Sequence, residues 1–147
     1  MRKMLVANYD VCTGCRICEL TCSFEKEGAY NPRFARLCVV TSDDGLWSDV
    51  VVCAQCENPA CLRVCPANAI ARDDERGIVV VDLERCTGCG LCAQYCYRQI
   101  IKLYSKAEGG QAYKCDLCDG RVPCVEACPT GALRLVELEE NVAIRVP

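Results

Sequence analysis

The 147-residue sequence contains no histidine, only two phenylalanines and one tryptophan. It also has no run of about 18 apolar residues, the length that a transmembrane helix needs. The missing histidine removes the commonest acid-base residue of enzymes, and neither a Walker loop nor a dinucleotide-binding glycine motif is present. The apolar stretch at the N-terminus is too short for a secretory signal. These absences predict a cytoplasmic chain that is not an enzyme by itself and has no direct membrane span.

Cysteine is abundant instead, with 17 residues. Sixteen of them fall into four groups of four, which we call tetrads one to four in chain order. The tetrads are Cys12, Cys15, Cys18 and Cys22; Cys53, Cys56, Cys61 and Cys65; Cys86, Cys89, Cys92 and Cys96; and Cys115, Cys118, Cys124 and Cys128. Tetrads one and three share the spacing Cys-x2-Cys-x2-Cys-x3-Cys, whereas tetrads two and four end in Cys-Pro. This alternation indicates duplication of a two-tetrad unit.

The spacing is typical of thiolate ligands of bacterial-type iron-sulfur clusters, in which the last cysteine of a run binds the neighbouring cluster. At four thiolates per cluster, the sixteen cysteines predict four [4Fe-4S] clusters. Gly14 and Gly88 should form the tight turns that wrap the odd tetrads around a cluster. A chain devoted to holding four redox centres is expected to conduct electrons.

The second and third tetrads are neighbours in sequence and should form one ferredoxin-like unit, around which the first and fourth tetrads close. Exchange of the last cysteines then predicts four ligand sets, which we call sites I to IV. Site I is Cys12, Cys15, Cys18 and Cys128; site II is Cys22, Cys115, Cys118 and Cys124; site III is Cys53, Cys56, Cys61 and Cys96; site IV is Cys65, Cys86, Cys89 and Cys92. The remaining Cys38 lies in an apolar run and is interpreted as a small buried hydrophobic residue.

Three other uses of cysteine fit the sequence less well. A disulfide framework belongs to an oxidising compartment, which no signal sequence indicates. All-cysteine zinc sites use two separated pairs per ion instead of runs of three closely spaced ligands. A radical-generating cluster needs Cys-x3-Cys-x2-Cys, which no tetrad provides as a complete set. A zinc-stapled structural module stays as the alternative from a different class.

The predicted fold class is α+β, with two intertwined ferredoxin-like modules in a single compact unit of residues 1–147. Residues 53–96 form the inner module, residues 1–30 plus 97–147 form the second, and residues 31–52 form an inserted hairpin beside a cluster. Short strands are expected at residues 4–8, 78–81, 100–104, 132–136 and 142–146, a hairpin at 70–81 and a turn at 137–140. Brief helices should lie where each tetrad ends in x3-Cys, because positions i and i+4 share a helical face.

Charged and aromatic residues flank the tetrads. The basic ones are Arg16, Arg63, Arg85, Arg98, Lys114 and Arg121. Positive charge near a cluster raises its reduction potential, although each of these side chains taken alone is expected to be solvated. Tyr95, Tyr97 and Tyr113 are interpreted as cluster cover and not as electron relays. The formal net charge of −3, before any cluster is added, argues against nucleic-acid binding.

The four tetrads in this order, from Cys12 to Cys128, resemble the four-cluster iron-sulfur subunits of molybdenum and tungsten oxidoreductases. Dimethyl sulfoxide reductase, nitrate reductase and formate dehydrogenase have such subunits. The segment from Cys18 to Pro32 looks more narrowly like the small subunit of tungsten-dependent aldehyde oxidoreductases and like carbon monoxide dehydrogenase-associated proteins of anaerobic metabolism. The resemblance implies the same exchanged ligand sets and a row of clusters that leads away from a catalytic subunit.

The implied partners are a catalytic subunit with a tungsten- or molybdenum-pterin cofactor, and a soluble redox carrier, a further electron-transfer subunit or stacked copies of the chain. An electron carrier for a nickel carbon monoxide dehydrogenase or a hydrogenase is the alternative. The sequence departs from the ferredoxin pattern at Tyr97, which follows Cys96 where proline is common. We also expect no membrane anchor of the kind that some larger relatives have.

Overall fold

The computed structural model describes residues 1–104 and 110–139 of the chain. Its elements are short, because ligand loops interrupt the chain at every tetrad. In order they are β1 (Arg2–Ala7), α1 (Ile17–Glu27), η1 (Pro32–Phe34), β2 (Cys38–Thr41), β3 (Ser48–Val51), α2 (Ala60–Arg63), β4 (Ile70–Asp73), β5 (Ile78–Val81), α3 (Leu91–Tyr95), β6 (Lys102–Tyr104), β7 (Gln111–Tyr113), η2 (Leu117–Gly120), α4 (Pro123–Glu126) and β8 (Leu133–Leu138). None of the helices in these described ranges is long and apolar enough to cross a membrane.

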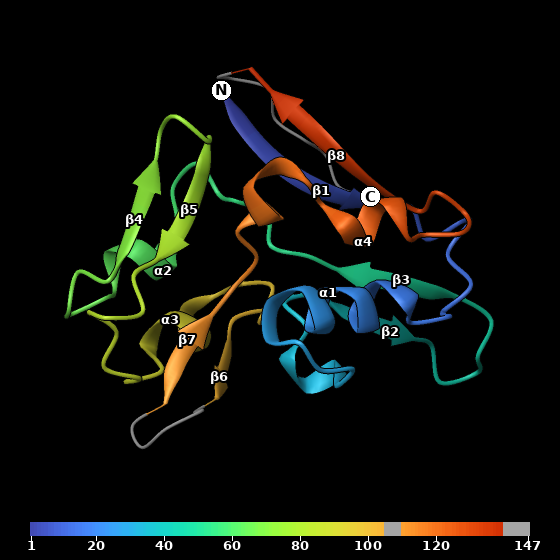
Figure 1. Ribbon diagram of the computed structural model, residues 1–147, viewed down its shortest axis with the longest axis horizontal. Coiled ribbons are helices and arrows are strands. Elements are labelled where there is room, and N and C mark those ends of the chain that lie inside the picture. Colours follow the sequence, from blue (N-terminus) through green and yellow to red (C-terminus); the bar gives the residue numbers. More distant parts are fainter. Residues whose placement is uncertain (105–109, 140–147) are drawn as a thin grey trace.

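The described strands pair into four separate antiparallel ribbons of two strands each (Figure 1). The β2–β3, β4–β5 and β6–β7 ribbons join strands that are close in sequence. The β1–β8 ribbon joins the two ends of the described chain, with Arg2 opposite Leu138 and Ala7 opposite Leu133. An isolated two-stranded ribbon is only marginally stable in water, so each ribbon depends on what packs against it.

Most of the predicted elements are present, with some differences in extent. Strand β5 has the predicted bounds, and a helix begins or lies at each tetrad where one was expected. Helix α1 is longer than expected, with 11 residues, and ends where Gly28 adopts a left-handed conformation and donates its N–H to the carbonyl of Phe24. Strand β8 continues through Leu138, so the turn predicted from residue 137 is wrong there. The strand predicted at residues 142–146 lies outside the described residues.

Two apolar clusters organise the molecule, and each includes cysteines of two tetrads. The larger cluster contains Leu5, Leu37, Val39, Val50, Ile78, Leu117 and Leu133, together with Cys12, Cys18, Cys22, Cys115, Cys124 and Cys128. The smaller contains Ile70, Val79, Ile101 and Ala112, together with Cys61, Cys65, Cys86, Cys92 and Cys96. Helix α1 accordingly contacts α4, and α2 contacts α3 (Figure 1). Cysteines of the first and fourth tetrads thus share one core, and cysteines of the second and third share the other.

Candidate metal centres

One backbone feature recurs in all four tetrads. The residue before the second cysteine has a positive φ in each, at 70° for Gly14, 45° for Gln55, 71° for Gly88 and 58° for Leu117. This left-handed turn brings the two cysteines of a Cys-x2-Cys pair to the same side of the loop. The glycines confirm the turns predicted in the odd tetrads. Gln55 and Leu117 were missed, because non-glycine residues rarely adopt this conformation and no sequence signal marks them.

At site I, the loop of the first tetrad joins the start of α1. Burial raises the pKa of Cys18 to about 12, and the nearby thiols of Cys15 and Cys12 add to that increase. Cys128 packs on the same apolar cluster as Cys12. Burial tends to raise the Cys128 pKa, but hydrogen bonds from the backbone of Leu133 and from Thr130 hold it below its ordinary value. The structure therefore brings Cys12, Cys15 and Cys18 together, and the fourth predicted ligand, Cys128, packs against the same apolar cluster.

The hairpin predicted beside a cluster is formed by β2 and β3, and it packs against the first-tetrad loop. A Cβ added to Gly14 would lie 2.6 Å from the Ser48 hydroxyl oxygen. Ser48 is buried, and its hydroxyl is 3.0 Å from that of Thr41. The close approach of loop and hairpin therefore requires glycine at this position.

Replacing Gly14 with alanine should be much more harmful than replacing Gly45, which has nearly the same φ of 71° but open space around it. Both substitutions force alanine into a left-handed conformation, at a cost of roughly 1–2 kcal/mol. Gly14→Ala should lower the free energy of unfolding by about 1–3 kcal/mol more, through overpacking against Ser48. Anaerobic denaturant titrations of the two iron-loaded variants measure this difference, and equal midpoints would contradict the contact.

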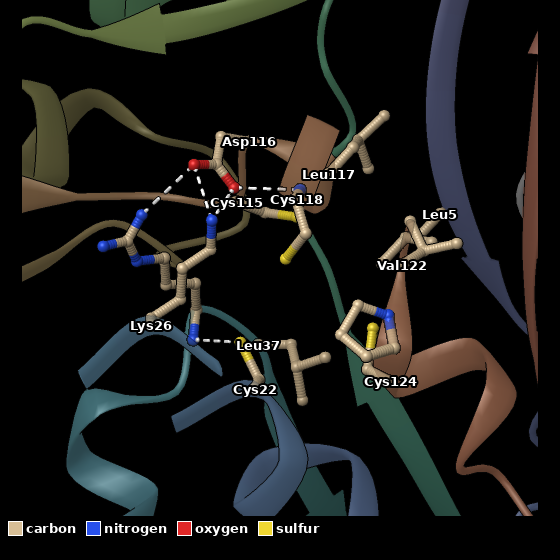
Figure 2. Close-up of a pocket in the computed structure, with 12 residues that line it drawn as sticks. Leu5, Cys22, Lys26, Leu37, Cys115, Asp116, Leu117, Cys118, Val122 and Cys124 are labelled. Atoms are coloured by element: carbon tan, nitrogen blue, oxygen red, sulfur yellow. Dashed lines mark hydrogen bonds and ion pairs between the residues drawn. The ribbon is translucent and has the colours of Figure 1, made fainter. Parts of the chain in front are cut away.

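Site II lies between α1, η2 and α4. Figure 2 shows the sulfur atoms of Cys22, Cys118 and Cys124 facing one space, which Cys115 also lines. Burial raises the pKa of Cys124 to about 12, with the thiols of Cys22 and Cys118 contributing in the same direction. All four predicted ligands of site II therefore line one pocket, together with apolar side chains such as Leu5 and Leu37.

Two cations border site II. The Lys26 Nζ lies 2.5 Å from the Asp116 carboxylate, and Arg36 Nη1 lies 3.6 Å from the same carboxylate (Figure 2). Burial opposes a charge on Lys26, but the ion pair with Asp116 raises its pKa above the ordinary value. Arg36 also stacks its guanidinium 5.2 Å from the ring centre of Tyr113. Lys26, Arg36 and Asp116 therefore form a charged cluster along one side of site II. The cluster connects α1 with the fourth tetrad.

Site III borders a cavity, although none of its four cysteines is exposed. Burial raises the pKa of Cys61 to about 11; the Lys114 charge opposes this, and the thiols of Cys53, Cys56 and Cys96 reinforce it. A cavity of about 350 Å³ is lined by Cys56, Cys61 and Cys96. Its lining includes Tyr95 and Tyr97, whose residues are 58% and 71% exposed. The predicted cover is therefore present beside the site, with much of both side chains facing solvent.

Site IV lies between α3 and the β4–β5 ribbon. Its four predicted ligands, Cys65, Cys86, Cys89 and Cys92, line one pocket. Burial raises the pKa of Cys92, and the three other thiols of the set contribute in the same direction. The grouping includes Cys65, which comes from the second tetrad, with three cysteines of the third.

Backbone N–H groups also point at cysteine sulfurs in sites II and IV. Arg36 donates to the Cys22 sulfur at 3.2 Å, Ala69 to the Cys65 sulfur at 3.3 Å, and Ala112 to the Cys86 sulfur at 3.4 Å. Such donors stabilise negative charge on a thiolate. Within residues 1–104 and 110–139, no three His, Cys, Asp or Glu side chains converge closely enough to hold one metal ion. The donor sets are all thiols arranged around spaces with N–H groups toward sulfur, which fits iron-sulfur clusters.

The four sites form a row. Cys18 and Cys22 are one turn apart on α1, so sites I and II are adjacent. Cys61 lies in α2 and Cys65 follows its C-cap Val64, so this short segment connects sites III and IV. The Cys53 thiol acts on the pKa of Cys115, which burial raises, so sites II and III are neighbours too. The order along the molecule is therefore I, II, III, IV.

The flanking basic residues follow the sequence interpretation except at Arg98, which is half-buried, and at Lys114. Arg63, Arg85 and Arg121 are exposed, as expected for solvated cations. The interpretation of Lys114 as a solvated side chain is wrong, because the residue is only 4% exposed and its ammonium is held by three oxygens. The only sequence signal for the burial of Lys114 was its position directly before the ligand Cys115. Cys38 is half-buried at the start of β2 and donates its S–H to the Val39 carbonyl.

Comparison with known proteins identifies iron-sulfur proteins as relatives of this chain. A family model described as a 4Fe-4S dicluster domain matches residues 48–138. The polyferredoxin-like subunit of an aliphatic sulfonate oxidoreductase from Pyrococcus furiosus is 40% identical over 119 residues, covering 81% of this chain and 67% of the relative. YnfG of Escherichia coli K12, named as a probable anaerobic dimethyl sulfoxide reductase chain, is 35% identical, covering 88% of this chain and 70% of the relative.

A solved structure with a similar fold is a chain of the active site complex BamBC of benzoyl coenzyme A reductase, as isolated. The TM-score is 0.51 at 25% identity, with 95% of this chain and 81% of that chain covered. The structural similarity therefore extends over nearly the whole chain, whereas the family model matches residues 48–138.

Proposed function

This chain belongs to the 4Fe-4S dicluster domain family, as an iron-sulfur electron-transfer subunit of the kind found in oxidoreductase complexes, and from that premise we propose a more specific role. It relays electrons through four [4Fe-4S] clusters between a tungsten- or molybdenum-pterin catalytic subunit, such as an aldehyde oxidoreductase, and another carrier. The observation that carries the proposal is the row of four all-thiol sites from I to IV.

The proposed ligands are the four sets of sites I to IV, in two modules that consist of residues 53–96 and of residues 1–30 plus 97–147. When bound, the clusters supply one-electron oxidation and reduction. The chain's own part is to hold each site beside the next, because Cys18 and Cys22 on α1, and Cys61 and Cys65 at α2, belong to different sites of each pair. The hairpin of residues 31–52 supports the first-tetrad loop through Ser48.

The side chains around the sites keep water away from the thiols and supply donors to them. Leu5, Leu37 and Val122 border site II, and Ile70 and Ala69 border site IV. Backbone N–H groups donate to the sulfurs of Cys22, Cys65 and Cys86. They stabilise negative charge at those sulfurs, and so favour the reduced state of the clusters. Apolar surroundings have the opposite effect on a charged group. The potentials are thus set by the balance between these residues.

The catalytic partner is inferred from two supports. One is the resemblance of the tetrads to the subunits of molybdenum and tungsten enzymes. The other is that similar chains are named as parts of a sulfonate oxidoreductase and of a dimethyl sulfoxide reductase. A carrier for nickel carbon monoxide dehydrogenase or hydrogenase is the alternative partner, and a soluble carrier, a further electron-transfer subunit or stacked copies of this chain would accept the electrons.

The proposal is tested by anaerobic purification of the tagged chain at native expression, with iron, zinc, tungsten, molybdenum and nickel quantified in everything that co-elutes. We expect about sixteen irons per chain and a large subunit that contains tungsten or molybdenum. Nickel in the co-eluting subunit would instead favour the alternative partner. About four zinc ions per chain without iron would show that the chain is a structural module and that electron transfer is wrong.

A further inference from the structure

A buried ammonium group lies at the junction of the second and fourth tetrads. Lys114 is 4% exposed, and its Nζ donates to the side-chain oxygen of Gln55 at 3.1 Å and to the carbonyl of Cys115 at 3.1 Å. It also donates to the carbonyl of Val79. All three acceptors are neutral oxygens. The ammonium is therefore fixed in position without being neutralised by the groups that hold it.

Gln55 makes this position rigid. It is fully buried, and its side-chain oxygen accepts a second hydrogen bond from the Val79 N–H at 2.9 Å. Its amide nitrogen donates to the Cys115 carbonyl at 2.8 Å. The network therefore ties the loop between Cys53 and Cys56 to strand β5 and to the first ligand of the fourth tetrad. It occupies the boundary between sites II and III, where the two halves of the row meet.

Within the part of the chain that the structure describes, Lys114 has no acidic partner to offset its charge. Among residues 1–104 and 110–139, none of the ion pairs involves Lys114, whereas Lys26 beside site II is paired with Asp116. Burying an ammonium without a counter-charge is strongly unfavourable, so a buried cation is normally paired. The negative groups nearest to Lys114 would be the clusters of sites II and III with their cysteine thiolates. The Lys114 charge already acts on the Cys61 thiol of site III, where it opposes the effect of burial.

We propose that Lys114 is the fixed counter-charge of the two central sites and that it raises the reduction potentials of sites II and III above the values they would have without it. This inference rests on the proposed function, because it assumes clusters at those sites. An electron that arrives at either central site adds one negative charge, which the ammonium stabilises. Lys114 is thus a positioning residue for electron transfer across the junction between the two modules, and Gln55 holds it in place.

The test uses the complete iron-loaded chain and compares Lys114→Met with Arg85→Met. Arg85 is a matched control, because it also precedes the first cysteine of a tetrad but is exposed. Iron per chain is measured first, and the reduction potentials are then measured by an anaerobic titration followed by electron paramagnetic resonance. We expect Lys114→Met to lower the reduction equilibrium constant of at least one cluster tenfold or more, which is a shift of about 59 mV for one electron. Arg85→Met should give a much smaller shift, because solvent screens an exposed charge.

Two further variants separate charge from packing. Lys114→Gln keeps a hydrogen-bond donor without the charge and should lower the potential like Lys114→Met, whereas Lys114→Arg should stay near the wild-type value. If the neutral variants lose iron while Lys114→Arg keeps it, the need for positive charge is supported by iron content alone. Unchanged potentials in iron-replete Lys114→Gln or Lys114→Met, or loss of iron from Lys114→Arg as well, would overturn the proposal. An iron-free wild-type chain would instead reject the proposed function itself.

Discussion

Stripping iron from the chain with a chelator should abolish its tertiary structure altogether. Cys18, Cys22 and Cys124 belong to the larger apolar cluster and Cys92 to the smaller one, so the proposed clusters would lie inside both cores. Helices α2, α3 and α4 have only four or five residues, too few to be stable alone, and every described ribbon has two strands. Without the metal centres, little remains that could hold these elements together, so folding and metal binding should be coupled.

Near-ultraviolet circular dichroism and the dispersion of amide resonances, recorded before and after anaerobic chelation, measure this loss. The control is the same chain incubated with chelator that is already saturated with iron. Adding iron and sulfide back should restore both signals. A stripped chain that still unfolds cooperatively, with protected amides in β1 and β8, would show that the polypeptide folds without its centres.

The second large effect is expected from Cys65→Ser. This substitution should remove or convert the cluster of Cys86, Cys89 and Cys92, although Cys65 belongs to the second tetrad in sequence. Its sulfur lines the pocket of the third-tetrad cysteines and accepts the Ala69 N–H. Up to about four of about sixteen irons should be lost, and the cluster of site III should stay.

Cys38→Ser is the matched control, because it replaces the one cysteine outside the tetrads and should leave the iron content unchanged. Iron analysis together with electron paramagnetic resonance of the reduced variants distinguishes the two sites. Loss of the site III signal in Cys65→Ser, with site IV intact, would overturn the exchanged ligand sets. A loss of iron in Cys38→Ser would show that this half-buried thiol has a role that the proposed sites do not include.

The features that could be predicted from the sequence are those that depend on local spacing. A gap of two residues with glycine before the second cysteine predicted the turns at Gly14 and Gly88, and the gap of three predicted a helical turn where each tetrad ends. A continuous run of β-branched residues, Ile78 to Val81, located β5 accurately. These signals are local because a ligand loop must take its shape within a few residues, whatever surrounds it.

The remaining features depend on contacts between distant parts of the chain. Strand β7 has three residues, too few for an alternation to be visible. Gln55 takes a left-handed turn because its buried side chain is held by Val79, Cys115 and Lys114, none of which is near it in sequence. Nothing in the sequence distinguishes Lys114 from a surface lysine. It is buried because β5 and the second tetrad pack around it. The central junction is therefore where reasoning from the sequence was least informative.

The pairing of β1 with β8 has a consequence for the order in which the protein can mature during synthesis. Residues 53–96 contain every proposed ligand of sites III and IV, so these two centres can be loaded while the remainder is still being translated. Sites I and II need Cys128 and Cys124, and β1 needs residues 133–138 as its partner. Strand β1 must therefore wait for residues 133–138 to be made, so sites I and II are completed after sites III and IV.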